Sequence, residues 1–171
     1  GFYDHHIPAV VDSIVSRAEF YTPYTPYQAE CAQGTLQAIY EYQSAICRLT
    51  DMDASNASVY DGGTALAESA VMALRITGRK NLIVDACVNP LYRKILKTYL
   101  SNLDCSVIEI MPDNYSLNTE EMEEKIDSDT AAVILQNPNF FGTIDDYSDI
   151  IEKAHSQKAL AVLSVYPVSL G

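Results

Sequence analysis

The sequence predicts an α/β protein with a doubly wound, mostly parallel sheet and an α-helical N-terminal arm. Three short apolar runs, at residues 82–85, 130–136 and 160–165, have no regular polar face, which is typical of strands covered on both sides. Segments with helical spacing alternate with these runs, as parallel strands joined by helices require. The chain of 171 residues is 48% hydrophobic, which is enough for an ordinary globular core.

The expected N-terminal arm covers residues 1–59. A first helix is predicted because apolar residues recur at helical spacing, at Ile7, Val10, Val11, Ile14, Val15 and Ala18. Residues 20–27 contain Pro23 and Pro26 among Tyr and Thr, which predicts an extended path ending at Gly34. A second helix is then expected to reach about residue 49, from the spacing of Leu36, Ile39, Tyr40 and Ile46.

Residues 60–171 are expected to form the α/β domain. A small-residue helix should begin at Asp61-Gly-Gly-Thr64 and stop at Gly78, before the strand at 82–85. Asn89-Pro90 should begin a helix whose buried stripe is Tyr92, Ile95, Leu96 and Tyr99, followed by a strand at 106–110. A capping box at Asn118–Glu121, with Leu117 and Met122 as hydrophobic staple, predicts a helix ending near Asp129. The last helix is expected at 145–157, between the strands at 130–136 and 160–165.

Charge and cysteine usage exclude several classes of protein. The formal net charge of −12 repels phosphate backbones, so no nucleic-acid partner is expected. No apolar run is long enough to span a membrane, and the N-terminus does not have the pattern of a signal peptide. Cys31, Cys47, Cys87 and Cys105 are too widely spaced for a zinc site, so we expect no metal and a reducing, cytoplasmic location.

Two loops are candidates for ligand binding. Gly62, Gly63 and Thr64 lie at a helix start, where free N–H groups can bind a phosphate, although a plain tight turn fits them as well. Asn137 and Asn139 follow the most apolar strand, and ligands of open sheets bind beyond the carboxyl ends of strands. We expect both groups to line one crevice, and an ordinary strand-to-helix connection is the alternative for the second. Because the chain stops soon after the strand at 160–165, part of such a site is expected to lie outside it.

Tyrosines are concentrated in the N-terminal arm. Seven of the 12 tyrosines fall within the first 60 residues, whereas the chain has only 4 phenylalanines. Tyrosine combines an apolar ring with a polar hydroxyl, which suits subunit interfaces and half-buried sites. The segment at 20–27 is therefore expected to have an interface or site role.

Several motifs together resemble the glycine decarboxylase P-protein family of the glycine cleavage system. They are YTPYQAE at 24–30, QGTLQ at 33–37, EYQ at 41–43, NASVYDGGTALAE at 56–68 and NPNFFG at 137–142. The resemblance covers the whole chain and is densest over residues 20–68. Among bacterial enzymes made of two polypeptides, the chain resembles the α subunit, or subunit 1. It implies a truncated large domain of the type I pyridoxal-phosphate fold.

The resemblance also implies an activity and partners. In that family, pyridoxal phosphate activates glycine, carbon dioxide leaves, and the aminomethyl group passes to the lipoyl arm of the H-protein. The implied partners are the β subunit, which holds the cofactor, the lipoylated H-protein and glycine. The positions expected to face the β subunit's cofactor pocket are Tyr24, Thr25, Tyr27, Gln28 and Glu30. The positions expected to keep a vestigial or weak cofactor site are Gly62, Gly63, Thr64, Asn137 and Asn139.

The chain departs from complete type I enzymes in two ways. No lysine follows a strand in the position needed to hold the cofactor covalently, and residues 164–167 have no carboxylate to pair with the pyridine nitrogen. We therefore expect no catalytic residue in this chain. Two alternatives remain open: a non-catalytic subunit that stabilises its partner, and a fragment of another pyridoxal-phosphate lyase or aminotransferase. A nucleotide-binding α/β domain also fits the fold alone.

Overall fold

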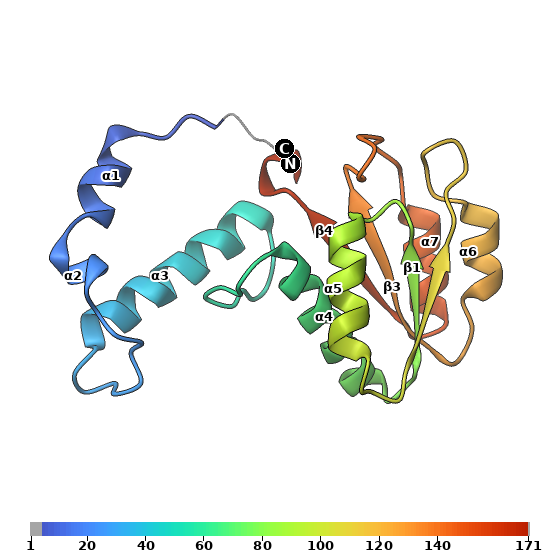
Figure 1. Ribbon diagram of the computed structural model, residues 1–171, viewed down its shortest axis with the longest axis horizontal. Helices are drawn as coiled ribbons and strands as arrows, with labels where there is room; N and C mark the ends of the chain where they lie inside the picture. The colour runs from blue at the N-terminus through green and yellow to red at the C-terminus, as the bar shows by residue number, and fades with distance from the viewer. Residues whose placement is uncertain (1–4, 171) are drawn as a thin grey trace. The chain divides into compact units, whose positions relative to one another are not determined.

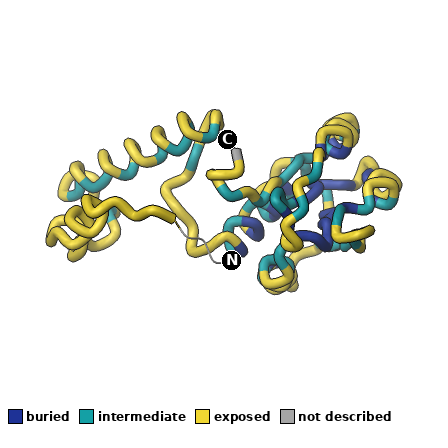
Figure 2. The backbone as a smooth tube through the Cα atoms, turned by 90° about the horizontal axis from the view of Figure 1, so that it is seen from above, coloured by how far each residue is buried: buried dark blue, intermediate teal, exposed yellow. Residues whose placement is uncertain are grey.

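The computed structural model describes residues 5–170, without the side chain of Leu170, and divides the chain into two units at residues 57 and 58. The boundary expected from the sequence lies two residues further on. The first unit contains α1 (Ala9–Val15), α2 (Ala18–Tyr21) and α3 (Gln33–Thr50). None of residues 5–57 is buried, as the tube in Figure 2 shows by its yellow and teal colours.

The second unit is a four-stranded parallel sheet with helices on both faces (Figure 1). Its strands are β1 (Asn81–Asp85), β2 (Ser106–Ile110), β3 (Thr130–Asn137) and β4 (Leu160–Val165), in the order β2-β1-β3-β4. The helices are α4 (Gly62–Thr77), α5 (Pro90–Leu100), α6 (Thr119–Lys125) and α7 (Ser148–Ser156), followed by a 3-10 turn at Pro167–Leu170. The predicted doubly wound α/β fold is confirmed.

Two apolar layers hold the helices to the sheet. On one face, α4 and α5 pack against the side chains of Leu82, Val84 and Ile134. On the other face, Met122 of α6 and Ile150 of α7 pack with Ile83, Val133 and Leu135. Successive strand residues point to opposite faces, so β1 and β3 contribute to both layers, as the apolar runs predict.

Several helix boundaries follow the predicted capping residues. The Asp61 side chain accepts a hydrogen bond from Thr64 N–H at the start of α4, and Gly78 ends that helix with φ of 68°. Asn89 caps α5, and Asn118 caps α6 by accepting from Glu121 N–H. Leu117 and Met122 pack in one cluster, as the predicted staple requires.

Other boundaries differ from the expectation, and local hydrogen bonds explain two of them. The first predicted helix is split at Ser16 and Arg17 into α1 and α2, and the non-helical stretch begins after Tyr21. Gly34, which was predicted to end that stretch, instead lies in the first turn of α3. Helix α6 ends at Lys125 because Ile126 is extended and Asp127 then forms a turn with Thr130. Helix α7 begins at Ser148, since the Asp146 carboxylate accepts from Ser148 N–H.

Burial corrects two further points of the sequence analysis. In α5, Leu100 is buried whereas Tyr99 is half-exposed, so the buried stripe runs through Leu96 and Leu100. Strand β4 pairs only with β3 among the described residues, so it is an edge strand in this part of the chain, and Leu163 and Val165 are exposed. Within the described chain, no helix is both long and apolar enough to cross a membrane.

Candidate functional site

The carboxyl edge of the sheet brings three loops together, those that follow β1, β2 and β3 (Figure 1). The backbone carbonyl of Tyr115, in the loop after β2, accepts hydrogen bonds from Asn139 Nδ2 at 2.9 Å and Thr143 Oγ1 at 3.2 Å. The Cys87 thiol, in the loop after β1, donates to the same carbonyl at 3.7 Å. Phe140 N–H also donates to the Cys87 carbonyl at 2.8 Å, so all three loops are joined.

The loop after β2 adopts a sparsely populated backbone conformation. Asn114 and Tyr115 both have positive φ, 47° and 68°, between residues Asp113 and Ser116, which pair as an antiparallel bridge. Two central residues with positive φ are typical of a type I′ turn, where glycine usually follows asparagine. Tyr115 occupies the glycine position, and its ring contacts Phe141 edge-on, with the centroids 5.3 Å apart. This turn places the Tyr115 carbonyl where the other loops reach it.

Asn139 holds its own loop in shape. It is almost fully buried, and its Oδ1 accepts from Phe141 N–H and Thr143 N–H while its Nδ2 donates to Tyr115. Asn137 precedes a cis peptide bond to Pro138, and its Nδ2 donates to the Asp145 carbonyl at 3.0 Å. The structure thus places both predicted asparagines at the carboxyl edge, with their side-chain N–H groups directed to backbone carbonyls of the protein.

The predicted phosphate-binding residues are at the start of α4, which packs against the first turns of α5. A Cβ atom built on Gly62 would lie 2.6 Å from the Tyr92 hydroxyl, and one on Gly63 would lie 2.5 Å from Ile95 Cδ1. Close helix packing therefore accounts for both glycines. The Thr64 N–H and hydroxyl donate to Asp61 Oδ1 at 2.7 and 2.8 Å, and these bonds hold the pKa of Asp61 below its usual value. A carboxylate is thus already bound at this helix start.

A chain of contacts connects the start of α4 with the loop after β3. Gln136 lies at the end of β3, and Asn89 lies immediately before α5. The Gln136 side chain accepts a hydrogen bond from Asn89 N–H at 2.8 Å. Tyr92, one turn further along α5, lies against Gly62. The two predicted binding segments are therefore both next to the start of α5, and within residues 5–170 no hydrogen bond joins them directly.

Three titratable side chains near the carboxyl edge, Asp85, Cys87 and Tyr147, were not among the site residues predicted from the sequence. Asp85 ends β1 and is fully buried, and burial raises its pKa. Burial, together with the nearby Asp85 carboxyl, also raises the pKa of the Cys87 thiol to about 12, so this cysteine stays protonated. Burial raises the pKa of Tyr147, whose hydroxyl donates to the Gln136 carbonyl at 3.1 Å. Of these groups, Asp85 could have been singled out from the sequence, because it is a charged residue directly at the end of an apolar strand.

The residues of this chain do not fit covalently bound pyridoxal phosphate. All six lysines are exposed, and none follows a strand at the carboxyl edge: Lys80, Lys94, Lys97, Lys125, Lys153 and Lys158. Strand β4 ends at Ser164 and Val165, followed by Tyr166, so no carboxylate is present there. The helix start that could bind the phosphate already has the Asp61 carboxylate on two of its donors. No group of three or more His, Cys, Asp or Glu side chains among residues 5–170 could hold a metal ion.

The segment at 20–30, which is rich in Tyr, Thr and Pro, lies in the first unit and is exposed. Tyr24 and Tyr27 expose 95% and 91% of their surface, and Thr25, Gln28 and Glu30 are exposed as well. Residues Pro23 to Gln28 have neither helix nor strand structure, and Tyr27 N–H donates to the Thr25 carbonyl at 2.8 Å, so the segment contains a tight turn. The five predicted partner-facing residues thus have their side chains available for contact.

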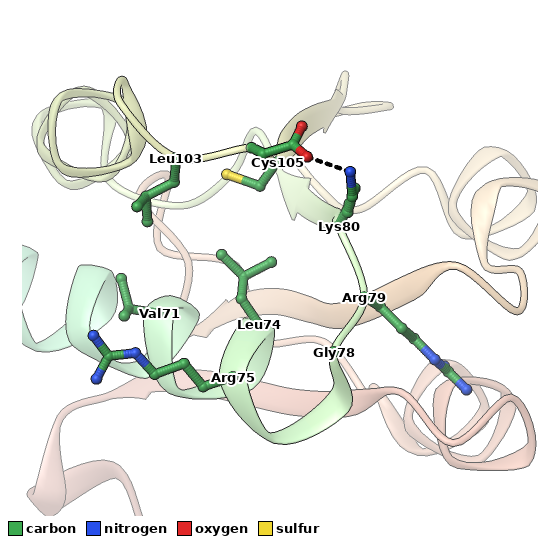
Figure 3. A pocket seen from close by; sticks show the side chains of 9 residues that line it. Val71, Leu74, Arg75, Gly78, Arg79, Lys80, Leu103 and Cys105 are labelled. Carbon is green, nitrogen blue, oxygen red and sulfur yellow. Dashed lines mark hydrogen bonds and ion pairs between the residues drawn. The ribbon is translucent and has the colours of Figure 1, made fainter.

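A separate hollow of about 280 Å³ lies at the opposite, amino-terminal edge of β1 (Figure 3). Val71, Leu74 and Leu103 line it, and a Lys80–Asp104 ion pair borders it. Figure 3 shows the Arg79 side chain directed away from the hollow. Its guanidinium donates instead to the Thr130 and Gln157 carbonyls, at 2.8 and 2.7 Å. This hollow is not one of the sites predicted from the sequence, and no predicted site residue lines it.

The sheet order, the helices on both faces and the loops at the carboxyl edge match solved structures of the type I pyridoxal-phosphate fold, which gives the class of the protein. A sphingosine-1-phosphate lyase of Burkholderia pseudomallei has this fold, with a TM-score of 0.69 and 13% identity over 88% of this chain and 38% of that one. A crystal structure of glycine decarboxylase (P-protein) of the glycine cleavage system in inhibitor-bound form is much more similar. Its TM-score is 0.91, with 41% identity over 99% of this chain and 38% of that one.

Sequence comparison gives the particular family. A sequence model described as "Glycine cleavage system P-protein" matches residues 1–171, and the chain belongs to this family. It is 60% identical over 171 residues to the probable glycine dehydrogenase (decarboxylating) subunit 1 of Geotalea daltonii. It is 54% identical over 168 residues to the protein of the same name from Nitratidesulfovibrio vulgaris. The chain spans about 39% of the length of the first of these relatives and 38% of the second.

Proposed function

We propose that this chain is part of a subunit 1 of glycine dehydrogenase (decarboxylating), which acts on glycine together with a second, cofactor-bearing subunit. The observation that carries the proposal is the 60% identity over all 171 residues to a protein of that name. In such an enzyme, pyridoxal phosphate supplies the electron sink for loss of carbon dioxide, and the protein binds and orients the reactants.

The lysine positions support a partner that holds the cofactor. Every lysine of the chain is exposed, on a helix or in a connection near the amino-terminal edge of the sheet. A lysine that forms a Schiff base needs a desolvated position next to the reacting carbon. We therefore assign covalent cofactor binding to the partner subunit and a contributing role to this chain.

The exposed segment at 24–30 supports a contribution across a subunit interface. Its tyrosines direct rings and hydroxyls outward, and no part of the same unit between residues 5 and 57 is buried. Apolar residues on and just before α1, namely Val10 and Val15 on the helix and Ile7 ahead of it, are also exposed. Burial of these side chains against another subunit would stabilise the unit, because apolar area removed from water contributes about 25 cal/mol per Å².

The test uses the full-length polypeptide, its candidate partner subunit and lipoylated H-protein. Release of labelled carbon dioxide from carboxyl-labelled glycine is measured for each subunit alone and for the mixture. We expect turnover only in the mixture. Full activity of the partner alone would assign a structural role to this chain, and activity of this chain alone would identify it as part of an independent lyase.

A further inference from the structure

Three aromatic rings are exposed next to one another at the carboxyl edge of the sheet. Tyr115, in the loop after β2, and Phe140 and Phe141, in the loop after β3, expose 68%, 51% and 48% of their surface. The Phe141 ring contacts both others edge-on, with centroids 5.3 Å from Tyr115 and 5.6 Å from Phe140. We call these three residues the aromatic patch. Single exposed rings are ordinary, whereas a group of adjacent ones is typical of an interaction site.

Tyr115 has a backbone conformation that tyrosine disfavours. Its φ of 68° is at the position of the turn where glycine is usual. The hydrogen bonds that Tyr115 accepts from Asn139 and Thr143 use only its backbone carbonyl, which glycine would supply as well. What tyrosine adds is therefore its ring, which faces Phe141 and solvent. Strained backbone of this kind is concentrated at functional sites.

Hydrogen bonds hold the aromatic patch in one arrangement. Asn139 accepts from Phe141 N–H and donates to the Tyr115 carbonyl, both at 2.9 Å, so one buried side chain fixes both loops. Phe140 N–H donates to the Cys87 carbonyl at 2.8 Å and ties the patch to the loop after β1. A preorganised surface loses less conformational entropy on binding than a mobile one.

The two loops that carry the aromatic patch contain acids and no bases. Asp113 lies in the first loop, and Asp145 and Asp146 lie in the second. No lysine or arginine occurs in residues 98–124 or 126–152. A second copy of this chain, with its net charge of −12, would bring like charges together here. The charges instead match a partner surface with lysine or arginine, and such cations also bind the faces of aromatic rings.

We propose that the aromatic patch is a docking site for the second, cofactor-bearing subunit, which contacts it through apolar residues accompanied by lysine or arginine. This inference rests on the proposed function, which supplies the partner. The rings form the desolvated centre of the contact, and the aspartates of the two loops form its polar rim, as in protein interfaces generally. The patch belongs to the α/β unit, so this contact is additional to that expected for residues 24–30.

The first test measures the affinity of full-length subunit 1 for the second subunit, together with the melting temperature of subunit 1 alone. Phe141→Ser removes the central ring and keeps the Phe141 N–H bond to Asn139. We expect it to weaken the complex by at least about tenfold, as loss of an aromatic residue at the centre of an interface does. The matched control is Tyr99→Ser on α5, where 49% of the tyrosine is exposed, and it should change the affinity by less than about twofold.

Tyr115→Gly separates binding from stability. Glycine adopts the positive φ of this position without strain, so the variant loses one ring contact but gains a relaxed turn. Its melting temperature should stay close to that of the parent subunit, whereas its affinity for the second subunit should fall by about tenfold. An equally tight complex, or a lower melting temperature without any loss of affinity, would mean that the ring serves packing within its own subunit and would overturn the proposal.

Charge complementarity is tested with Asp113→Asn. The affinity of the parent subunits should fall as the salt concentration rises, and this variant should bind about twofold more weakly with a smaller dependence on salt. The control is Asp104→Asn, at the amino-terminal edge of the sheet, which should bind like the parent. An affinity that does not depend on salt would contradict a basic partner surface.

The failure of this inference differs from that of the proposed function. If the parent subunits form no complex and show no turnover, both are wrong. If they form an active complex that Phe141→Ser and Tyr115→Gly join as tightly as the parent, only docking at the aromatic patch is wrong.

Discussion

At the scale of single residues, the Asn139 side chain makes more hydrogen bonds than that of Asn137, the other asparagine predicted at the carboxyl edge. Asn139→Ala removes two acceptor bonds and one donor bond in a buried position. The Phe141 and Thr143 N–H groups lose their side-chain acceptor, so we expect a loss of about 2 kcal/mol of unfolding free energy. Chemical denaturation of the full-length protein measures this loss.

An exposed asparagine provides the control for that substitution. Asn102→Ala, in the connection between α5 and β2, removes a solvent-exposed amide and should change stability by no more than about 0.5 kcal/mol. Equal effects of the two substitutions would show that the loop does not depend on Asn139.

The asparagines also show the limit of sequence analysis at this scale. An amide directly after an apolar strand can be placed at the carboxyl edge because strand direction is fixed by the alternation of strands and helices. The direction of its N–H groups cannot be predicted, since it depends on Tyr115, which is 24 residues away in a different loop. A tyrosine with positive φ gives no local signal in the sequence.

At the scale of elements, the packing of α4 against α5 explains why the first two residues of α4 are glycines. Gly63→Ala places a Cβ atom 2.5 Å from Ile95 Cδ1, so either the isoleucine or the helix must move. We expect a loss of about 1 kcal/mol from this overpacking. Combining it with Ile95→Val, which removes the contacting methyl group, should restore part of the loss in a double-mutant cycle.

A glycine in the other long helix provides the matched control. At Gly34, in the first turn of α3, a Cβ atom would have no other heavy atom within 4 Å, so Gly34→Ala should be neutral or stabilise by about 0.5 kcal/mol. If Gly63→Ala is equally neutral, the glycine pair is not explained by helix packing, and the predicted phosphate role gains support.

The exposed segment at 24–30 carries the prediction about the subunit interface. In the full-length complex, Tyr27→Phe should lower glycine turnover while subunit assembly stays intact, because it removes a hydroxyl from an exposed ring without changing its shape. Turnover and size-exclusion profiles of the assembled enzyme measure the two effects. Unchanged turnover in single variants of Tyr24, Thr25, Tyr27, Gln28 and Glu30 would contradict this role.

Element boundaries were predictable where a side chain caps the helix, and much less so elsewhere. Asp61, Asn89 and Asn118 each cap the helix expected from them, because an Asx side chain has a strong local preference for this position. The early end of α6 depends on the turn between Asp127 and Thr130, which competes with helical structure. Apolar spacing alone does not reveal that competition.

At the scale of the whole molecule, the doubly wound sheet follows directly from the sequence pattern. Apolar strands that alternate with helices allow little else, and the parallel order β2-β1-β3-β4 agrees with this. The position of β4 at the edge of the described sheet could not be predicted from its composition. An apolar strand can lie either at the centre or at the edge of the strands that one chain contributes. Function depended on motif resemblance, since this fold is compatible with many activities.

The fold and the lysine positions together lead to a prediction for the chain as a whole. The 171-residue chain alone should neither decarboxylate glycine nor bind pyridoxal phosphate covalently. None of its lysines follows a strand at the carboxyl edge of the sheet, the end of β4 has no carboxylate, and Asp61 occupies donors at the start of α4. Remaining affinity for the phosphate at Gly62 and Gly63 should be too weak to survive dialysis.

The measurement is a titration of the purified chain with pyridoxal phosphate, followed by borohydride reduction and peptide mapping. Exposed lysines react slowly and without preference with any aldehyde, so low labelling spread over several of the six lysines is the expected result. The full-length mixture of both subunits serves as the positive control, in which labelling should be confined to the partner. Stoichiometric labelling of one specific lysine in this chain would assign it a cofactor site of its own, because only a desolvated, oriented amine reacts with such selectivity.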